Sequence, residues 1–172
     1  MSLHPESLIN FEVYENGANF LGIAQVSLPN INELTMTIAG AGIMGNVDAV
    51  LIGMTDAMHC TFNFRSATDA AIKLLSPVKH LVDLRVAEQH WDSVGTQRTI
   101  DADKYILGII PQNYTPGDVV PATTANTTLE FSCYYYAGYK NGSQIFEVDQ
   151  FNYIFKVGGV DYLAAVRKAL GK

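Results

Sequence analysis

Apolar and polar side chains alternate with a period of two along most of this chain, and this feature constrains its fold most. Residues 57–65 read AMHCTFNFR, with apolar side chains at 58, 60, 62 and 64 and polar ones between them. Successive strand residues point to opposite faces, so the pattern predicts antiparallel sheets with one buried and one wet face. The same alternation recurs at 10–17, 20–28, 34–38, 81–91, 99–110, 127–137 and 144–157. We expect about seven to nine strands.

Two segments carry helix signals instead. Residues 66–76 have Ser66 or Thr68 as a cap and end before Pro77, and residues 160–171 end at Gly171. The prediction is a mainly β chain, an antiparallel β-sandwich or barrel with one or two flanking helices.

No linker or internal repeat divides the chain, so residues 1–172 are expected to form a single domain. Residues 111–128 are rich in Pro, Thr and Asn and are predicted to form a mobile surface loop. Cys60 and Cys133 lie in apolar runs and are interpreted as buried, reduced thiols.

The amino-acid composition argues against several classes of function. Charged residues make up 16% of the chain against a usual value of about 25%, while apolar residues make up 48%. Few charged and many apolar residues favour either a subunit that buries surface in an assembly or a monomer with a large core. The net charge is −6 and no Lys/Arg cluster is present, which argues against specific nucleic-acid binding. No apolar run is long enough to insert into a membrane, and the N-terminus lacks the order of a secretory signal.

The stretch TIAGAGIMGNVDA, residues 37–49, contains the spacing G-x-G-x-x-G of a dinucleotide-binding turn. That turn requires an apolar strand before it and a helix beginning within it. Here the preceding strand is half polar, and the residues after Gly45 form no amphipathic helix. We therefore interpret these glycines as allowing a sharp turn or a close approach to another backbone.

The other residues that could bind a metal ion or catalyse a reaction have no suitable second residue at the required spacing. His59 and Cys60 are strand neighbours and point to opposite faces, so one metal ion cannot easily take both. Asp101 and Asp103 share a strand face, and could form an acid–base pair, a cation site or a solvated acidic face. No catalytic, cofactor-binding or metal-binding residues are predicted.

Three successive tyrosines lie in the strand around Cys133. The alternation predicts that Tyr135 points inward with Phe131 and Cys133, and that Tyr134 and Tyr136 lie on the other face. Aromatic side chains on a nominally wet face favour a contact with another protein.

Several motifs occur together in a fixed order. The N-terminal part carries N-G, G-x-A, L-P, G-A-G-x-x-G and a GM-D-M run, at Asn16, Gly17, Gly22, Ala24, Leu28, Pro29, Gly40, Ala41, Gly42, Gly45, Gly53, Met54, Asp56 and Met58. The C-terminal part adds Glu147, Asp149, Asn152, Gly159, Val160, Asp161, Leu163, Arg167 and Gly171. In these positions the chain resembles the major tail tube proteins of contractile-tailed phages and of phage-tail-like, R-type bacteriocins. Residues 66–128 match less clearly, and Gly158 replaces a usual Asn.

The resemblance implies a non-enzymatic subunit, without cofactors, whose hexameric rings stack into the inner tube of a contractile tail. Such a tube is a conduit for DNA or ions. The implied partners are further copies of the chain and the sheath, tape-measure, baseplate and tail terminator proteins, within a particle assembled in the bacterial cytoplasm. Candidate ring-contact residues are Gly40, Gly42, Ile43, Met44, Gly45, Tyr134 and Tyr136, and Asp101 and Asp103 are candidates for the bore.

Two alternative functions remain open. One is a related β-domain adaptor, such as a tail terminator, a baseplate hub or the tube protein of a secretion system. The other is an enzyme that uses a nucleotide at the glycine turn.

Overall fold

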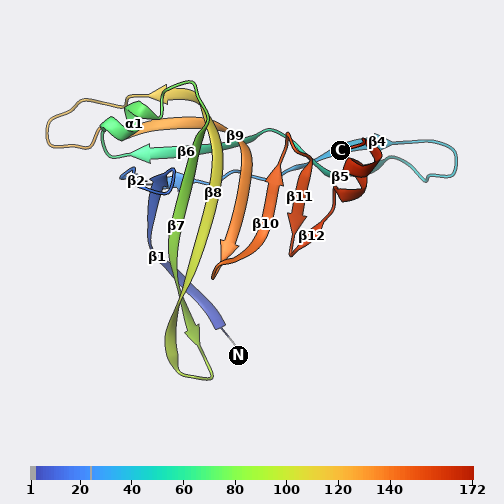
Figure 1. Ribbon diagram of the computed structural model, residues 1–172, viewed down its shortest axis with the longest axis horizontal. Helices are drawn as coiled ribbons and strands as arrows, with labels where there is room; N and C mark the ends of the chain where they lie inside the picture. Colours follow the sequence, from blue (N-terminus) through green and yellow to red (C-terminus); the bar gives the residue numbers. More distant parts are fainter. Residues whose placement is uncertain (1–2, 24) are drawn as a thin grey trace.

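The computed structural model describes residues 3–23 and 25–172, so Ala24 of the motif series lies outside the described residues. Within these described residues, twelve strands and two short helices follow one another (Figure 1). Their bounds are β1 Leu3–Glu15, β2 Asn19–Phe20, β3 Gln25–Ser27, β4 Glu33–Ile38, β5 Val47–Thr55, β6 Met58–Phe64, α1 Asp69–Lys73, β7 His80–Asp92, β8 Gln97–Thr115, β9 Thr127–Lys140, β10 Ser143–Asp149, β11 Ile154–Val157, β12 Val160–Asp161 and α2 Ala164–Ala169.

Ten of these strands form one antiparallel sheet, in the order β12-β11-β10-β9-β8-β7-β1-β2, with β6 pairing β9 and β3 pairing β6. Strand β9 joins two parts of this sheet. Its first half, up to Cys133, pairs with β6, and its second half, from Tyr135, pairs with β10. The sheet therefore folds over along β8 and β9, and the core lies inside the bend (Figure 1).

Alternating side chains of the bent sheet fill that core. Phe62, Phe131 and Ile109 are completely buried, and the Phe62 and Phe131 rings lie 4.9 Å apart between centroids. Burial of side chains of this size contributes about 1.5–3 kcal/mol each. The predicted β fold with short flanking helices is confirmed. The extra strands relative to the sequence expectation are short, as β2, β3 and β12 contain only two or three residues each.

Both helices are shorter than expected. Helix α1 begins after Thr68, whose hydroxyl accepts a hydrogen bond from the Ala71 amide at 3.2 Å. The segment predicted to form the second helix begins instead as strand β12, because Val160 and Asp161 pair with β11. Among the described residues, no helix is both long and apolar enough to cross a membrane.

The predicted loop at 111–128 is also shorter. Strand β8 continues to Thr115 and β9 begins at Thr127, so the connection comprises residues 116–126. Its two ends are held together, because the Asp118 amide donates to the Ala125 carbonyl at 3.0 Å and the Thr127 hydroxyl donates to the Pro116 carbonyl at 3.0 Å.

Candidate assembly surfaces

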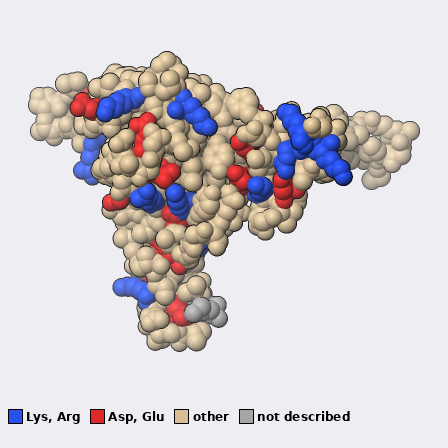
Figure 2. All heavy atoms as spheres, viewed as in Figure 1, with Lys and Arg blue, Asp and Glu red and all other residues tan. Residues whose placement is uncertain are grey.

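Strands β4 and β5 form a separate two-stranded sheet that extends from the body at one end of the long axis (Figure 1). We call residues 33–55 the arm. Its only charged residues are Glu33 and Asp48, and its far end carries no charge in Figure 2. Isolated two-stranded hairpins are marginally stable in water, so an arm of this kind gains from packing against another surface.

One face of the arm is entirely apolar. Met36 pairs with Ala49 and Ile38 pairs with Val47, and alternation adds Leu34 and Leu51 to the same face. All of these side chains except the half-buried Ala49 are exposed, and Met36 retains 54% of its accessible surface. The opposite face is mixed, with a hydrogen bond of 2.8 Å from the Thr37 hydroxyl to the Asp48 carboxylate. A contiguous exposed apolar face marks a site of association.

The predicted contact residues Gly40–Gly45 form the tip of the arm. The Ile43 amide donates to the Gly40 carbonyl at 3.2 Å, and Gly42 and Gly45 have φ values of 92° and 90°. Met44 is fully exposed, at 102%. Within the part of the chain that the structure describes, no atom lies within 4 Å of a Cβ built at these three glycines. The glycines therefore fit the backbone conformation of the turn, and the tip is surrounded by open space.

The glycine turn lacks the structural feature that a nucleotide-binding enzyme would require. The turn is followed at Val47 by strand β5, whereas a bound phosphate needs the N-terminus of a helix.

The base of the arm is fixed to the C-terminal segment. Gly53 has a φ of 65°, and a Cβ at this position would lie 2.7 Å from Cγ of Leu163. The Gln150 side-chain amide donates to the Thr55 hydroxyl at 3.0 Å and to the Asp56 carbonyl at 2.9 Å. The arm is thus held where it leaves the body while its apolar face stays exposed.

The structure separates the two tyrosines predicted to form a contact surface. Gly108 of β8 pairs with Tyr135 but its neighbour Ile109 pairs with Cys133, so Tyr134 is the extra residue of a β-bulge. The bulge reverses the alternation, and Tyr136 faces the core with 5% of its surface exposed. The prediction that Tyr136 lies on the wet face of the strand is therefore wrong. Tyr134 remains half-exposed beside the ring of Phe151, 5.2 Å away between centroids.

Asp101 and Asp103 share a face, as predicted, and that face continues into the core. Asp103 pairs with Val86, and Asp101 pairs with Glu88. The carboxylate of Asp101 lies 3.5 Å from Nδ1 of the buried His90 and 3.8 Å from Nζ of Lys140. Burial raises the pKa of Asp103 above its ordinary value. These carboxylates belong to a half-buried charged cluster and not to an open acidic surface.

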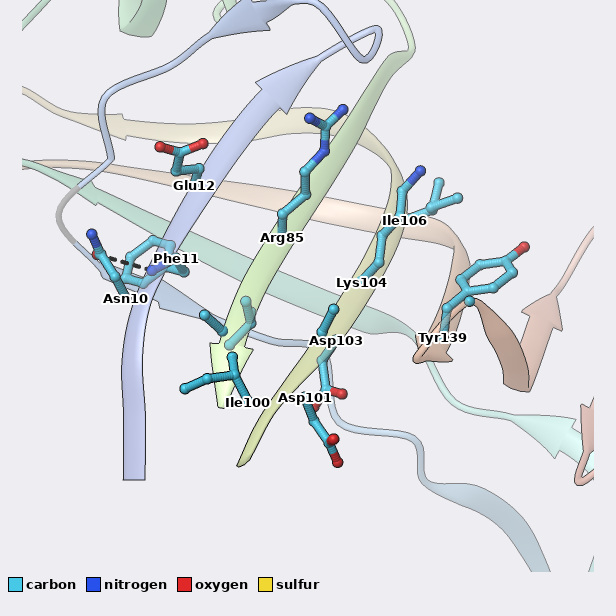
Figure 3. Close-up of a pocket in the computed structure, with 14 residues that line it drawn as sticks. Asn10, Phe11, Glu12, Arg85, Ile100, Asp101, Asp103, Lys104, Ile106 and Tyr139 are labelled. Carbon is cyan, nitrogen blue, oxygen red and sulfur yellow. Dashed lines mark hydrogen bonds between the residues drawn. The ribbon is translucent and has the colours of Figure 1, made fainter. Parts of the chain in front are cut away.

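The opposite face of the same strands is hollowed. A depression of about 810 Å³ spans β1, β7, β8 and the β9–β10 turn (Figure 3). Its lining residues come from both faces of these strands: Asn10, Glu12, Arg85, Ala87, Ala102 and Lys104 lie on the face away from Val86, and Phe11, Val86, Asp101 and Asp103 lie on the other. Arg85 pairs with Lys104 and Ala87 pairs with Ala102, which puts these four side chains on the face away from Val86. In Figure 3, Arg85 and Lys104 project in one direction and Asp101 and Asp103 in another.

The large sheet ends in strands with unpaired sides. Among the described residues, β1 pairs with β2 only at Tyr14 and Glu15, so residues 5–12 have no strand partner away from β7. At the other end the edge strand is the two-residue β12, which pairs with Lys156 and Val157 of β11, and the Tyr162 amide that follows it donates to the Phe155 carbonyl at 2.9 Å. Exposed strand edges are templates for pairing with another chain.

The arrangement of this bent sheet is the fold of tube and terminator subunits of contractile injection systems. A sheath/tube terminator from an extracellular contractile injection system aligns with a TM-score of 0.57 at 11% identity, over 79% of this chain and 97% of that one. A subunit of the sheath–tube complex from such a system aligns with a TM-score of 0.55 at 12% identity, over 78% of this chain and 91% of the other.

The chain belongs to the family of phage tail tube protein FII, which matches residues 5–171. The tail tube protein of Escherichia phage P2 is 25% identical over 170 residues, covering 97% of this chain and 98% of the relative. The family identification confirms the resemblance inferred from the glycine and C-terminal motifs. It also confirms a structural, non-enzymatic protein that is a component of a phage tail or tail-like particle.

Proposed function

We propose that this chain assembles into hexameric rings that stack into the inner tube of a contractile tail or an R-type bacteriocin, forming a conduit for DNA or ions. The observation that carries the proposal is the arm, whose uncharged tip and apolar face have no packing partner on the described part of the chain. In a tube, these side chains become buried against neighbouring copies.

The unpaired sheet edges support closure into a ring. The edge at residues 5–12 and the edge at β12 are different surfaces at opposite ends of one sheet. Pairing between two different surfaces of identical subunits is head-to-tail and closes into a ring when the rotation permits. The same pairing satisfies backbone groups that a monomer leaves to water.

The arm tip is proposed to lie where one ring meets the next. Gly42, Ile43, Met44 and Gly45 then contact the adjacent ring, and half-exposed Tyr134 is a further candidate contact. The sheath, tape-measure, baseplate and tail terminator proteins are the proposed partners of the finished tube, which we propose to be assembled in the host cytoplasm.

Electron microscopy of concentrated purified protein tests this function. We expect long hollow tubes with six-fold symmetry in cross-section. Isolated rings or monomers at every concentration would instead favour the adaptor alternative, a terminator or hub that does not polymerise.

A single substitution tests the role of the arm tip. We expect Gly42→Val to leave the subunit folded and to abolish tube growth, because the φ of 92° disfavours a β-branched residue and the tip loses its shape. Circular dichroism and light scattering measure the two properties. Gly40→Ala is the matched control, since Gly40 lacks a positive φ and has open space around it. Normal growth of Gly42→Val tubes contradicts this role.

A further inference from the structure

We infer that the arm tip of one copy inserts into a pocket formed by the β8–β9 connection of a copy in the adjacent ring. We call this connection, residues 116–126, the receiving loop. The inference rests on the proposed tube and names the surface that meets the tip there.

The receiving loop forms an open pocket with a volume of about 290 Å³, and Val119 and Val120 are among the residues that line it. Val119 is 99% exposed and Val120 is 54% exposed. Residues 119–126 carry no charged side chain. Interface cores are depleted of charge, and clustered exposed apolar side chains mark sites of association, so this pocket has the character of a protein contact.

The backbone holds the receiving loop in one shape. Gly117 has a φ of 78°, and a Cβ at this position would overlap the carbonyl oxygen of Ala125. The Thr123 hydroxyl donates a hydrogen bond to the Val120 carbonyl at 3.0 Å, in addition to the bonds that join the two ends of the loop. A pocket that is already formed loses little conformational entropy when it is filled.

The arm tip has the chemistry that such a pocket accepts. Met44 projects fully into solvent, and Ile43 beside it is 39% exposed. Gly42 and Gly45 on either side carry no side chain, so the tip is narrow. Methionine is unbranched and flexible, and it fills irregular apolar gaps.

The charges of the two surfaces favour this pairing over a contact between two arms. Arg65 lines the pocket and has no ion pair among the described residues, not even with Asp118 of the same pocket, whereas the other three arginines each pair with a carboxylate. The arm carries Asp48 close to its tip and contains no Lys or Arg. Such a match between an arginine and a carboxylate selects the partner and its orientation more than it adds affinity.

The tip and the receiving loop lie at opposite ends of the long axis (Figure 1). The tip of a chain therefore reaches the pocket of another copy and not its own. A contact between two different surfaces is head-to-tail, and it leaves a free tip at one end of the stack and a free pocket at the other. Each added ring then offers the same surface to the next, as the growth of an open-ended tube requires.

Disulfide trapping in assembled material tests the contact. Tubes of Met44→Cys/Val119→Cys are oxidised with diamide and separated by denaturing electrophoresis without reductant. We expect a ladder of dimers, trimers and longer chains, because each copy contributes one cysteine to each of two contacts. Native Cys60 and Cys133 do not interfere, because each is 1% exposed and burial raises the pKa of the Cys133 thiol to about 12.

Met44→Cys/Val94→Cys is the matched control, since Val94 is a 76% exposed valine in the β7–β8 turn, and we expect no ladder from it. Ile43→Cys/Val120→Cys provides a second pair across the same contact. If the unmodified chain forms tubes, a missing ladder from both pairs, or an equal ladder from the control, overturns the inference. Absence of tubes from the unmodified chain would contradict the proposed function instead.

Discussion

Single residues show how local environment decides the role of a side chain in this subunit. Asp101 and Asp103 follow the alternation that the sequence predicts, but their face of β8 continues into the core. One oxygen of Asp103 is buried without a hydrogen-bond partner in the described structure, close to Glu88 and Lys140. A carboxylate in this position costs folding free energy when it is charged.

The cost of a charged Asp103 predicts how the stability of the folded chain depends on pH. Burial first, and then repulsion from Glu88 and Asp101, raise the pKa of Asp103, while Lys140 opposes the shift. Because the folded pKa lies above the unfolded one, the stability of the native chain falls as pH rises through the range of this carboxyl. We expect Asp103→Asn to increase the free energy of unfolding at about pH 7 and to have less effect at about pH 3. Urea unfolding at both values measures this, and an equal effect at both would contradict it.

At the scale of elements, the arm differs from the central strands of the large sheet. Strands β6, β7, β8 and β9 bury several side chains in the core, whereas β4 buries none and β5 buries only Gly53 at the base, which Leu163 and Gln150 hold in place. The sequence around the arm alternates like the other strands, so alternation predicts strands without showing what covers them. The covering surface belongs to another molecule in the proposed tube.

The two faces of the arm should therefore respond differently to substitution. We expect Met36→Ser/Ile38→Ser to leave the unfolding temperature of the subunit nearly unchanged and to stop polymerisation, because the apolar face loses the burial that drives association. Thermal unfolding and sedimentation of assembled material provide the two readings. Thr35→Ser on the opposite face is the control and should polymerise normally. Retained assembly of the double variant would exclude the apolar face as a contact surface.

At the scale of the whole molecule, a low charged fraction and free sheet edges describe a subunit completed by its own copies. The surfaces proposed to join subunits are apolar side chains and backbone edges, while Lys104 and Arg98 pair with carboxylates of the same chain. Assembly should then depend little on ion pairs between subunits.

Salt provides the corresponding measurement. Surface ion pairs weaken once the Debye length falls to a few ångströms, whereas apolar burial does not. We expect the critical concentration for tube growth to change less than about threefold between about 0.1 M and 1 M NaCl. Light scattering over a concentration series determines it, and dissolution of tubes at high salt would point to ion pairs as the main contact.

The sequence alone determined the strand-rich fold, the turn at the glycines and the family, because alternation, glycine spacing and ordered motifs are local properties. Only the tertiary structure decided that Tyr136 faces the core, that the arm stands apart from the sheet, and which face of β8 is hollow. The physical reason is that a one-residue bulge opposite Gly108, and the pairing of β9 with both β6 and β10, depend on contacts between residues far apart in the chain.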